Sequence, residues 1–440
     1  MEHFARRVGA QDLTPLEPVI YRPRDLSLFL ACRFFSTAAM QVQSVAIGWR
    51  IYEITRDPLS LGLVGLCQFV PMFVLTLPAG DIADRSDPRR VFSLSLIAQA
   101  LCGALLFAGM FAETRLVWPY YAVLIAFGAA RGMAGPSSQS LLPFLVSSQM
   151  LPRAIAWSSS VFQIAVIVGP ALGGLLYALG PAAAFGFAIA GFLFAGTGVA
   201  TLAGRRRAEG LPTKAGLRSR IAEGLWFVRC RPVLLGAISL DLFAVLLGGA
   251  TALLPIFARD ILHTGPVGLG LLRSAPAVGA ALVATTLGRR PIDRAAGARM
   301  FAAVAIFGLA TIVFGLSTNF YLTLSALAVL GASDMVSVYI RHALVQFSTP
   351  DEMRGRVSAV NVLFIGASNE LGEFESGVTA AWIGTVPAVI VGGIGTLLVV
   401  ALWMRFFPPL RKIDRLADAA VPQNDQAQAD GVPRPSTSSG

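Results

Sequence analysis

Residues 91–111 read VFSLSLIAQALCGALLFAGMF, an apolar run of 21 residues without a single charge. An α-helix of about 20 apolar residues crosses a hydrocarbon core about 30 Å thick. The run is continuous rather than alternating, and in lipid a helix satisfies its own backbone hydrogen bonds, so a helix is favoured over a barrel strand. Directly before it, GDIADRSDPRR at 80–90 carries three arginines and marks an aqueous boundary. This stretch therefore predicts a transmembrane helix.

Further runs of the same kind lie along the whole chain of 440 residues. The sequence is 55% hydrophobic and 14% charged, whereas soluble domains average about 45–50% and about 25%. A soluble fold could not bury that much apolar surface, so the composition excludes a soluble enzyme and a nucleic-acid binder. We predict an all-α membrane protein with twelve transmembrane helices, the other eleven near 26–49, 60–79, 117–142, 155–178, 182–203, 233–257, 267–287, 300–316, 320–346, 357–381 and 386–407.

The 35 basic residues orient this set of helices. With a cytoplasmic amino terminus, 27 of them fall in cytoplasmic segments, and only Arg56, Arg115 and Arg259 fall in the opposite loops. Cytoplasmic loops carry the excess of Lys and Arg in membrane proteins, so we expect both termini in the cytoplasm. The net charge of +10 then reflects topology. We expect a multi-pass membrane protein that binds no nucleic acid.

A long hydrophilic segment at 204–231 divides the predicted helices into two sets of six. Its later part places Ile221, Leu225, Trp226 and Val228 among charges, which indicates an amphipathic helix on the membrane surface. The end of the chain is polar and rich in Pro, Ser and Gln, which is typical of a disordered tail. The predicted organisation is a cytoplasmic amino-terminal segment, a six-helix bundle, a cytoplasmic linker, a second six-helix bundle and a cytoplasmic tail, at 1–24, 25–203, 204–231, 232–407 and 408–440.

The second half of the chain weakly repeats the first, at an offset near 203 to 209 residues. Duplicated six-helix halves typically surround a site near the bilayer midplane and move against each other. The repeat therefore predicts two pseudo-symmetric bundles. At a constant offset of 203 the matched positions are Gly128 with Gly331, Arg153 with Arg356, Ala156 with Ala359, Gly169 with Gly372, and Gly174 with Gly377.

The polar stretch at 80–90 resembles a known signature. With Gly80, Asp84, Arg85, Arg89 and Arg90, GDIADRSDPRR closely resembles the loop between the second and third helices of the major facilitator superfamily. A carboxylate such as Asp84 can accept backbone N–H groups at a helix amino terminus, where negative charge is favoured. The resemblance implies that it locks a cytoplasmic gate against the start of the helix at 357–381, near Arg356, in the outward-facing state. The alternative is a basic loop that only sets topology.

A second motif lies in the predicted helix at 155–178. GPALGG, with Gly169, Pro170, Gly173 and Gly174, resembles the core of a motif in exporters and antiporters of the same superfamily, although Ala156 and Ala165 replace its upstream glycines. Packing alone could also explain these small residues. The stretches at 223–249, 349–361 and 367–377 resemble the branch that includes the enterobactin exporter and related efflux permeases. The resemblance implies the major facilitator fold, with two pseudo-symmetric six-helix bundles, in a bacterial inner membrane.

Four charged residues lie inside predicted helices, where an ionisable group is expensive and normally faces a cavity or a partner. The repeat relates Arg33 to Asp241 at an offset of 208, and Arg131 to Asp334 at 203, so related positions carry opposite charges. The family resemblance implies that their four helices line the central cavity. We hypothesise that the four residues form a charged ring that binds substrate and changes partners during transport. Static ion pairs, or side chains that reach the membrane interface, are the alternative.

Proton coupling needs a carboxyl group whose protonation changes as the conformation alternates. The first half of the chain has no acid deep in a predicted helix, so the candidates are Asp241, Asp334, Glu370, Glu373 and Glu375. Glu370 and Glu373 are three residues apart and share one face of their helix. They either contact a ligand or pair with an arginine, Arg273 or Arg341, and both interpretations stay open.

Together these features predict a secondary active transporter that exports a small organic molecule, siderophore-like or drug-like, by proton antiport with alternating access. The alternatives are an importer of a small solute, or a sensor or assembly partner that does not transport. The four cysteines and three histidines are dispersed, and neither a nucleophile with a base nor a nucleotide loop is visible. We therefore expect no enzyme, no cofactor and no metal. We expect a monomer in the lipid bilayer that binds its small-molecule substrate and protons.

Overall fold

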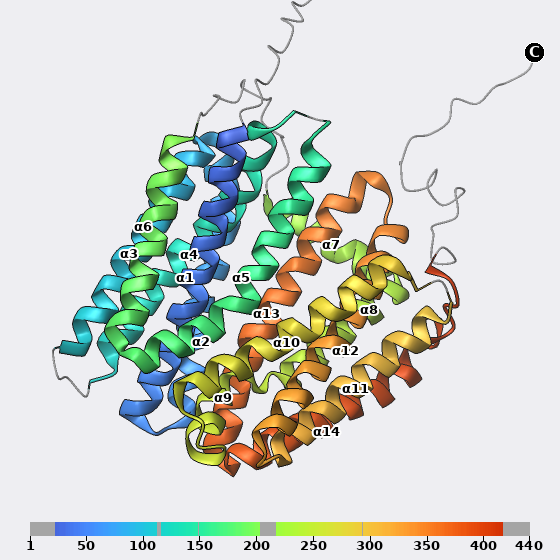
Figure 1. The fold of residues 1–440 in the computed structure, drawn as a ribbon. Coiled ribbons are helices and arrows are strands. Elements are labelled where there is room, and N and C mark those ends of the chain that lie inside the picture. Colours follow the sequence, from blue (N-terminus) through green and yellow to red (C-terminus); the bar gives the residue numbers. More distant parts are fainter. Residues whose placement is uncertain (1–22, 112–115, 148, 203–216, 293, 417–440) are drawn as a thin grey trace, which may run out of the picture.

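The computed structural model describes residues 23–111, 116–147, 149–202, 217–292 and 294–416, which form helices (Figure 1). The first group of helices is α1 (Pro23–Thr55), α2 (Pro58–Arg85), α3 (Pro88–Phe111), α4 (Trp118–Leu145), α5 (Leu151–Leu179) and α6 (Pro181–Thr201). The second group is α8 (Pro232–Gly248), η1 (Ala250–Leu253), α9 (Leu254–Ile256), η2 (Phe257–Ile261), α10 (Gly265–Arg289), α11 (Ala296–Leu316), α12 (Phe320–Phe347), α13 (Asp351–Ile383), α14 (Thr385–Phe406) and α15 (Pro408–Arg411). Between them lies α7 (Leu217–Cys230).

Each of the twelve predicted spans coincides with one long helix, if the interrupted segment from α8 to η2 is counted as one. Within the described residues, nine spans are long and apolar enough to cross a membrane. The other three long helices are α1, α4 and α13, which include the charged residues Arg33, Arg131 and Glu370. A span that lines a polar cavity loses apolar character in this way.

The helices pack as two bundles. In the first, α1 lies against α5 and α6, and α2 against α4. In the second, α12 lies against α10 and α11, and α14 against α11 and α8. The bundles meet where α5 packs on α10 and α2 on α13. The predicted limits of the linker and tail stay predictions, since residues 203–216 and 417–440 lie outside the described part of the chain.

Equivalent glycines make equivalent contacts in the two bundles, as the repeat in the sequence predicts. A Cβ added to Gly128 of α4 would lie 2.1 Å from the carbonyl oxygen of Gln68 in α2. A Cβ added to the related Gly331 of α12 would lie 1.9 Å from the carbonyl oxygen of Pro276 in α10. Small residues let helix backbones approach this closely. The two bundles are therefore related in packing as well as in sequence.

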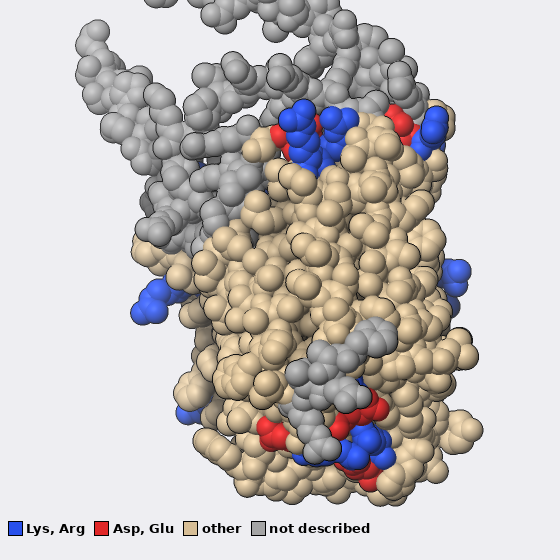
Figure 2. Space-filling model, turned by 90° about the vertical axis from the view of Figure 1, so that its left-hand side faces the viewer, with Lys and Arg blue, Asp and Glu red and all other residues tan. Residues whose placement is uncertain are grey.

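The surface divides into charged ends and an uncharged middle. Figure 2 shows most Lys, Arg, Asp and Glu near the upper and lower ends of the face in view. In the broad belt between them, charge is seen only in basic side chains at the left and right edges. Exposed apolar side chains such as Leu94, Leu101 and Leu105 of α3 lie outside the core. A lipid-facing surface has this distribution, because charge within the hydrocarbon region is costly.

The predicted amphipathic helix of the linker is present as α7, which packs on α13 and α8. Its Glu223 forms an ion pair of 2.8 Å with Arg356 near the start of α13. Trp226 and Leu225 stay exposed, at 68% and 47%. One side of α7 thus packs on the second bundle, and the other side carries exposed apolar side chains. That α7 lies at the membrane surface stays a prediction.

Candidate functional site

A cavity of about 170 Å³ lies between the two bundles. Its volume is below the roughly 300–1,000 Å³ typical of ligand pockets, so it must widen to admit a larger molecule. The lining combines amide, hydroxyl and charged side chains with apolar ones from both bundles. The residues are Met40, Gln41, Gln43, Ser44, Ile47, Gly48, Leu61, Val64, Gln68, Leu124, Phe127 and Arg131 from the first bundle and Ala252, Pro255, Arg273, Glu370 and Glu373 from the second.

Two contacts of the charged lining join the bundles. The guanidinium of Arg131 in α4 forms an ion pair of 3.3 Å with the carboxylate of Glu370 in α13. Arg273 of α10 donates to the backbone oxygen of Ser44 in α1 at 3.1 Å. Glu373 accepts a longer hydrogen bond, 3.4 Å, from the hydroxyl of Thr251 in η1. Two arginines and two glutamates therefore balance each other in a cavity whose walls come from separate bundles.

Of the four residues predicted to form a charged ring, Arg131 is the one that lines this cavity. Arg33 donates to the hydroxyl of Ser138 in its own bundle at 3.0 Å, and its guanidinium lies 5.4 Å from the ring centre of Phe162. Asp241 forms a buried ion pair with Arg341 inside the second bundle. In this conformation the four side chains are therefore not assembled into one ring, because three of them face partners within their own bundle. A change of partners during transport stays a prediction.

The remaining acidic candidates have distinct surroundings. Asp334 lines a second, small cavity together with Asp241. Glu370 contacts Arg131 rather than either arginine that was considered from the sequence. Glu373 shares the large cavity with Arg273. Glu375 accepts a hydrogen bond of 2.7 Å from Thr379 one turn further along α13. The acids thus fall into a pair in the large cavity, a pair in the small one, and a residue held within its own helix.

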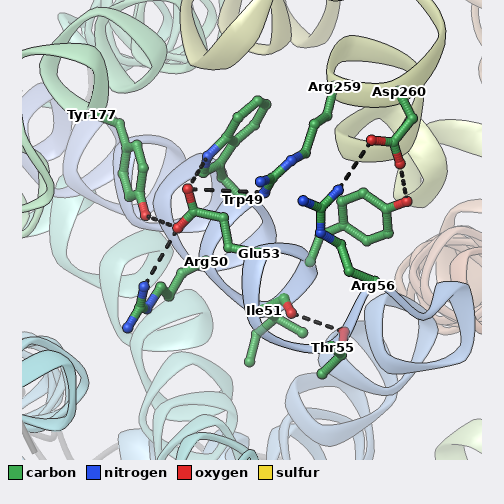
Figure 3. A network of polar contacts seen from close by, with 10 residues as sticks. Trp49, Arg50, Ile51, Glu53, Thr55, Arg56, Tyr177, Arg259 and Asp260 are labelled. Carbon is green, nitrogen blue, oxygen red and sulfur yellow. Dashed lines mark hydrogen bonds and ion pairs between the residues drawn. The ribbon is translucent and has the colours of Figure 1, made fainter. Parts of the chain in front are cut away.

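One end of the molecule is closed by a network that the sequence reasoning missed (Figure 3). We call it the latch, and it consists of Trp49, Arg50, Tyr52, Glu53, Arg56, Tyr177, Arg259 and Asp260. Across the bundles, Asp260 in η2 accepts a hydrogen bond from Tyr52 and forms an ion pair of 3.2 Å with Arg56. Arg259 lies 3.9 Å from Glu53, and its guanidinium is 5.7 Å from the ring centre of Trp49.

The centre of the latch is Glu53, which Trp49 and Tyr177 hold by hydrogen bonds of 2.9 and 3.2 Å. The sequence did contain a signal. The first span of each half of the repeat ends with an acidic and a basic residue, Glu53 and Arg56 in the first half and Arg259 and Asp260 in the second. We assigned those arginines to topology alone. Their position at the ends of equivalent helices could have indicated that they meet.

The GPALGG motif of α5, residues 169–174, contributes to the same closed end. Gly169 and Gly173 of α5 face α1, where an added Cβ would lie 2.6 Å from Gln41 and 3.0 Å from Val42. Pro170 and Gly174 face the other bundle, and a Cβ on Gly174 would lie 2.3 Å from the carbonyl oxygen of Pro266 in α10. Gly377 of α13, the equivalent of Gly174 in the repeat, lies against Gly62 of α2. A Cβ added to Gly377 would lie 2.8 Å from the Cα of Gly62. Related glycines thus let both helix pairs close.

Replacing Gly174 by leucine should force this end open, since overpacking of such a contact costs about 1–3 kcal/mol. Spin labels on the exposed residues Trp118 and Trp382, which lie in different bundles at this end, should move apart in distance measurements by electron resonance. Gly186→Leu is the matched control, because nothing lies within 4 Å of a Cβ at Gly186. An unchanged label distance in Gly174→Leu would contradict the assigned role.

The structure describes part of the predicted cytoplasmic gate motif. Arg89 donates to the backbone oxygen of Leu202 at 2.5 Å and pairs with Asp87 at 3.3 Å, which joins the start of α3 to the end of α6. Arg90 lies 3.9 Å from Asp87. Gly80, Asp84 and Arg85 lie in α2, and their contacts lie outside the described part of the structure. The predicted lock against the start of α13 therefore stays a prediction.

Two helix bundles that enclose a charged cavity and meet at one end define a membrane transporter of the major facilitator class. The chain belongs to the transmembrane secretion effector family of this superfamily, which it matches over residues 12–430.

The curated relatives are similar over most of the chain. It is 27% identical to the enterobactin exporter of Citrobacter koseri over 399 residues, which cover 89% of this chain and 93% of the relative. It is 26% identical to the enterobactin exporter of Shigella boydii over 395 residues, with the same coverage of 89% and 93%.

Solved structures share the fold. A mutant of the nucleoside transporter NupG matches with a TM-score of 0.69 and 13% identity, over 87% of this chain and 100% of that one. A bacterial homologue of the human lysosomal transporter Spinster matches with a TM-score of 0.68 and 14% identity, over 89% and 99%. The predicted class of fold and the predicted superfamily are confirmed.

Proposed function

We propose that this chain exports a small organic molecule across a bacterial inner membrane by alternating access, driven by exchange for protons. The observation that carries the proposal is the charged cavity between the bundles, with a latch that closes one end of the molecule. The resemblance to enterobactin exporters over 89% of the chain supports outward transport and a siderophore-like substrate.

The distribution of basic residues supports the direction. It predicts that the ends of α2 and α3 at residues 85–88 face the cytoplasm, and that the latch faces the outside. In Figure 1 the bundles meet near the lower part of α5 and α10 and lie further apart towards the upper end. A conformation latched on the outside is the one in which an exporter collects its substrate from the cytoplasm.

The lining of the cavity supports an anionic or catechol-bearing substrate. An arginine presents a planar fork of donors that matches carboxylates and related oxygen pairs. Glu370 forms an ion pair with Arg131, so an anionic ligand that binds Arg131 would take the place of Glu370.

The proposal is tested by comparing the small molecules secreted by cells with and without the gene. A compound lost from the medium is then offered to inside-out membrane vesicles with an imposed proton gradient, acidic inside. We expect uptake that collapses when the gradient is removed. Uptake that occurs only in right-side-out vesicles would assign import, and binding without transport in either orientation would assign a sensor.

A further inference from the structure

A second buried charge cluster lies inside the second bundle, away from the substrate cavity. Arg341 of α12 is 1% exposed and forms an ion pair with Asp241 of α8, which is 6% exposed. Asp241 and Asp334 both line a cavity of about 10 Å³, together with the hydroxyl-bearing Ser337. None of these residues lines the larger cavity.

The charges of this cluster do not balance. Among the described residues, Asp241 and Arg341 are the charged groups that act on Asp334. His342, next to Arg341 in the chain, is exposed, and it senses the charges of Arg341 and Asp241. From α11 the small cavity receives the apolar Val304 and Phe307. Arg273, inside neighbouring α10, points into the substrate cavity instead. Two carboxylates therefore share one guanidinium, which leaves a net negative charge at membrane depth, where uncompensated charge is costly.

The cluster also has unused hydrogen-bonding capacity. The Nε of Arg341 is buried and has no hydrogen-bond partner among the described residues. A cavity of about 10 Å³ is close to the smallest that holds one water molecule. Two carboxylates and a hydroxyl provide too few oxygens for the six or more ligands of a typical hard cation, but they suffice to share a proton.

One continuous stretch of chain connects this cluster to the substrate cavity and to the latch. Val245 of α8 lines the small cavity, and its carbonyl oxygen would lie 2.8 Å from a Cβ on Gly372, between Glu370 and Glu373 in α13. Further along, η1 and α9 contribute Ala252 and Pro255 to the substrate cavity, and η2 contributes Asp260 to the latch. A small displacement of α8 would therefore reach all three sites.

We propose that Asp241, Asp334 and Arg341 form the proton-binding site of the transport cycle, separate from the substrate cavity. The proton binds as an O–H bond on one carboxylate and is shared with the other, while Arg341 keeps an anionic partner. Its release to water restores two carboxylates around one guanidinium. This inference rests on the proposed proton-driven export. It assigns proton binding to the two aspartates and not to the glutamates of the substrate cavity.

Infrared difference spectra of the purified full-length protein, between about pH 6 and about pH 9, test the site without any substrate. Exposed carboxyl groups are already ionised throughout this range. A background with E370Q and E373Q removes the carboxyl groups of the large cavity. We expect a carbonyl band of a protonated carboxylic acid at the lower pH. Because the proton is shared, D241N and D334N should each abolish the band, while E375Q should retain it.

Two results would overturn the proposal. A band that survives either aspartate variant contradicts a shared proton, and a band removed by added sodium ions at constant pH assigns the site to that cation. If an aspartate variant does not fold, R341K, which keeps both carboxylates and the positive charge, must retain the band. The experiment needs no transported compound, so its failure is distinguishable from failure of the export assay.

Discussion

Replacing Arg131 by methionine is expected to lower the initial rate of gradient-driven uptake into inside-out vesicles by about 10- to 100-fold. Arg131 is the first-bundle member of the ion pair with Glu370 and lies in the lining of the cavity. A hydrogen bond to a charged group contributes about 1.5–3 kcal/mol, which corresponds to that range of rates. The measurement uses the compound identified by comparing secreted molecules, with protein amounts matched by immunoblot.

A double variant, R131M/E370Q, distinguishes a loss of substrate binding from a loss of protein stability. Arg131→Met alone leaves Glu370 without its ion-pair partner, which can destabilise the protein as well as the bound state. In the double variant R131M/E370Q that charge is removed, so thermal stability should recover while transport stays low. Transport restored to the wild-type rate in the double variant would show that Arg131 serves the structure and does not bind substrate.

The second large effect is expected at the latch. The double variant D260N/E53Q removes the ion pairs of Asp260 with Arg56 and of Glu53 with Arg259, both of which join the chain at the end of α1 to η2. We expect the population open at this end to rise about 10-fold, which corresponds to a loss of about 1.4 kcal/mol. A cysteine at Ser44, in the lining of the cavity, reports the opening by its reaction rate with a membrane-impermeant thiol reagent. The four native cysteines are replaced in this background.

Asp57 provides a matched control for the latch. It lies at the same end of the molecule, but its carboxylate accepts from Leu59 and Ser60 at the start of α2 within one bundle. Asp57→Asn removes a comparable charge without breaking a contact between bundles, so the cysteine at Ser44 should react at the unaltered rate. Equal rates in D260N/E53Q and the control would mean that the latch does not hold this end closed.

Much of the fold follows from local sequence. An apolar run such as 91–111 forms a helix whatever lies around it, because in lipid its backbone groups pair within the run itself. The two pseudo-symmetric bundles that the repeat predicted also pack alike, since Gly128 and its equivalent Gly331 both lie against a neighbouring backbone. The amphipathic pattern near Trp226 likewise predicted α7.

The candidate site was predicted less completely. Arg131 and Glu370 were each singled out as charges within a helix, but their pairing joins residues 239 positions apart on different bundles. Arg33, equally conspicuous in sequence, contacts Ser138 inside its own bundle. Whether an intramembrane charge faces the cavity or its own bundle depends on the rotation of each helix, which packing fixes and spacing along the chain does not.

The sequence by itself determined the number of helices, their repeat and the expected orientation in the membrane, because these depend on runs of about 20 residues and on the loops beside them. The tertiary structure alone decided which charges meet. Asp241 joins Arg341 in a closed cluster, whereas Asp260, from the same span, reaches Tyr52 of the other bundle. The physical reason is that an ion pair depends on a distance of a few ångströms between side chains, and only the packing of the two bundles sets that distance.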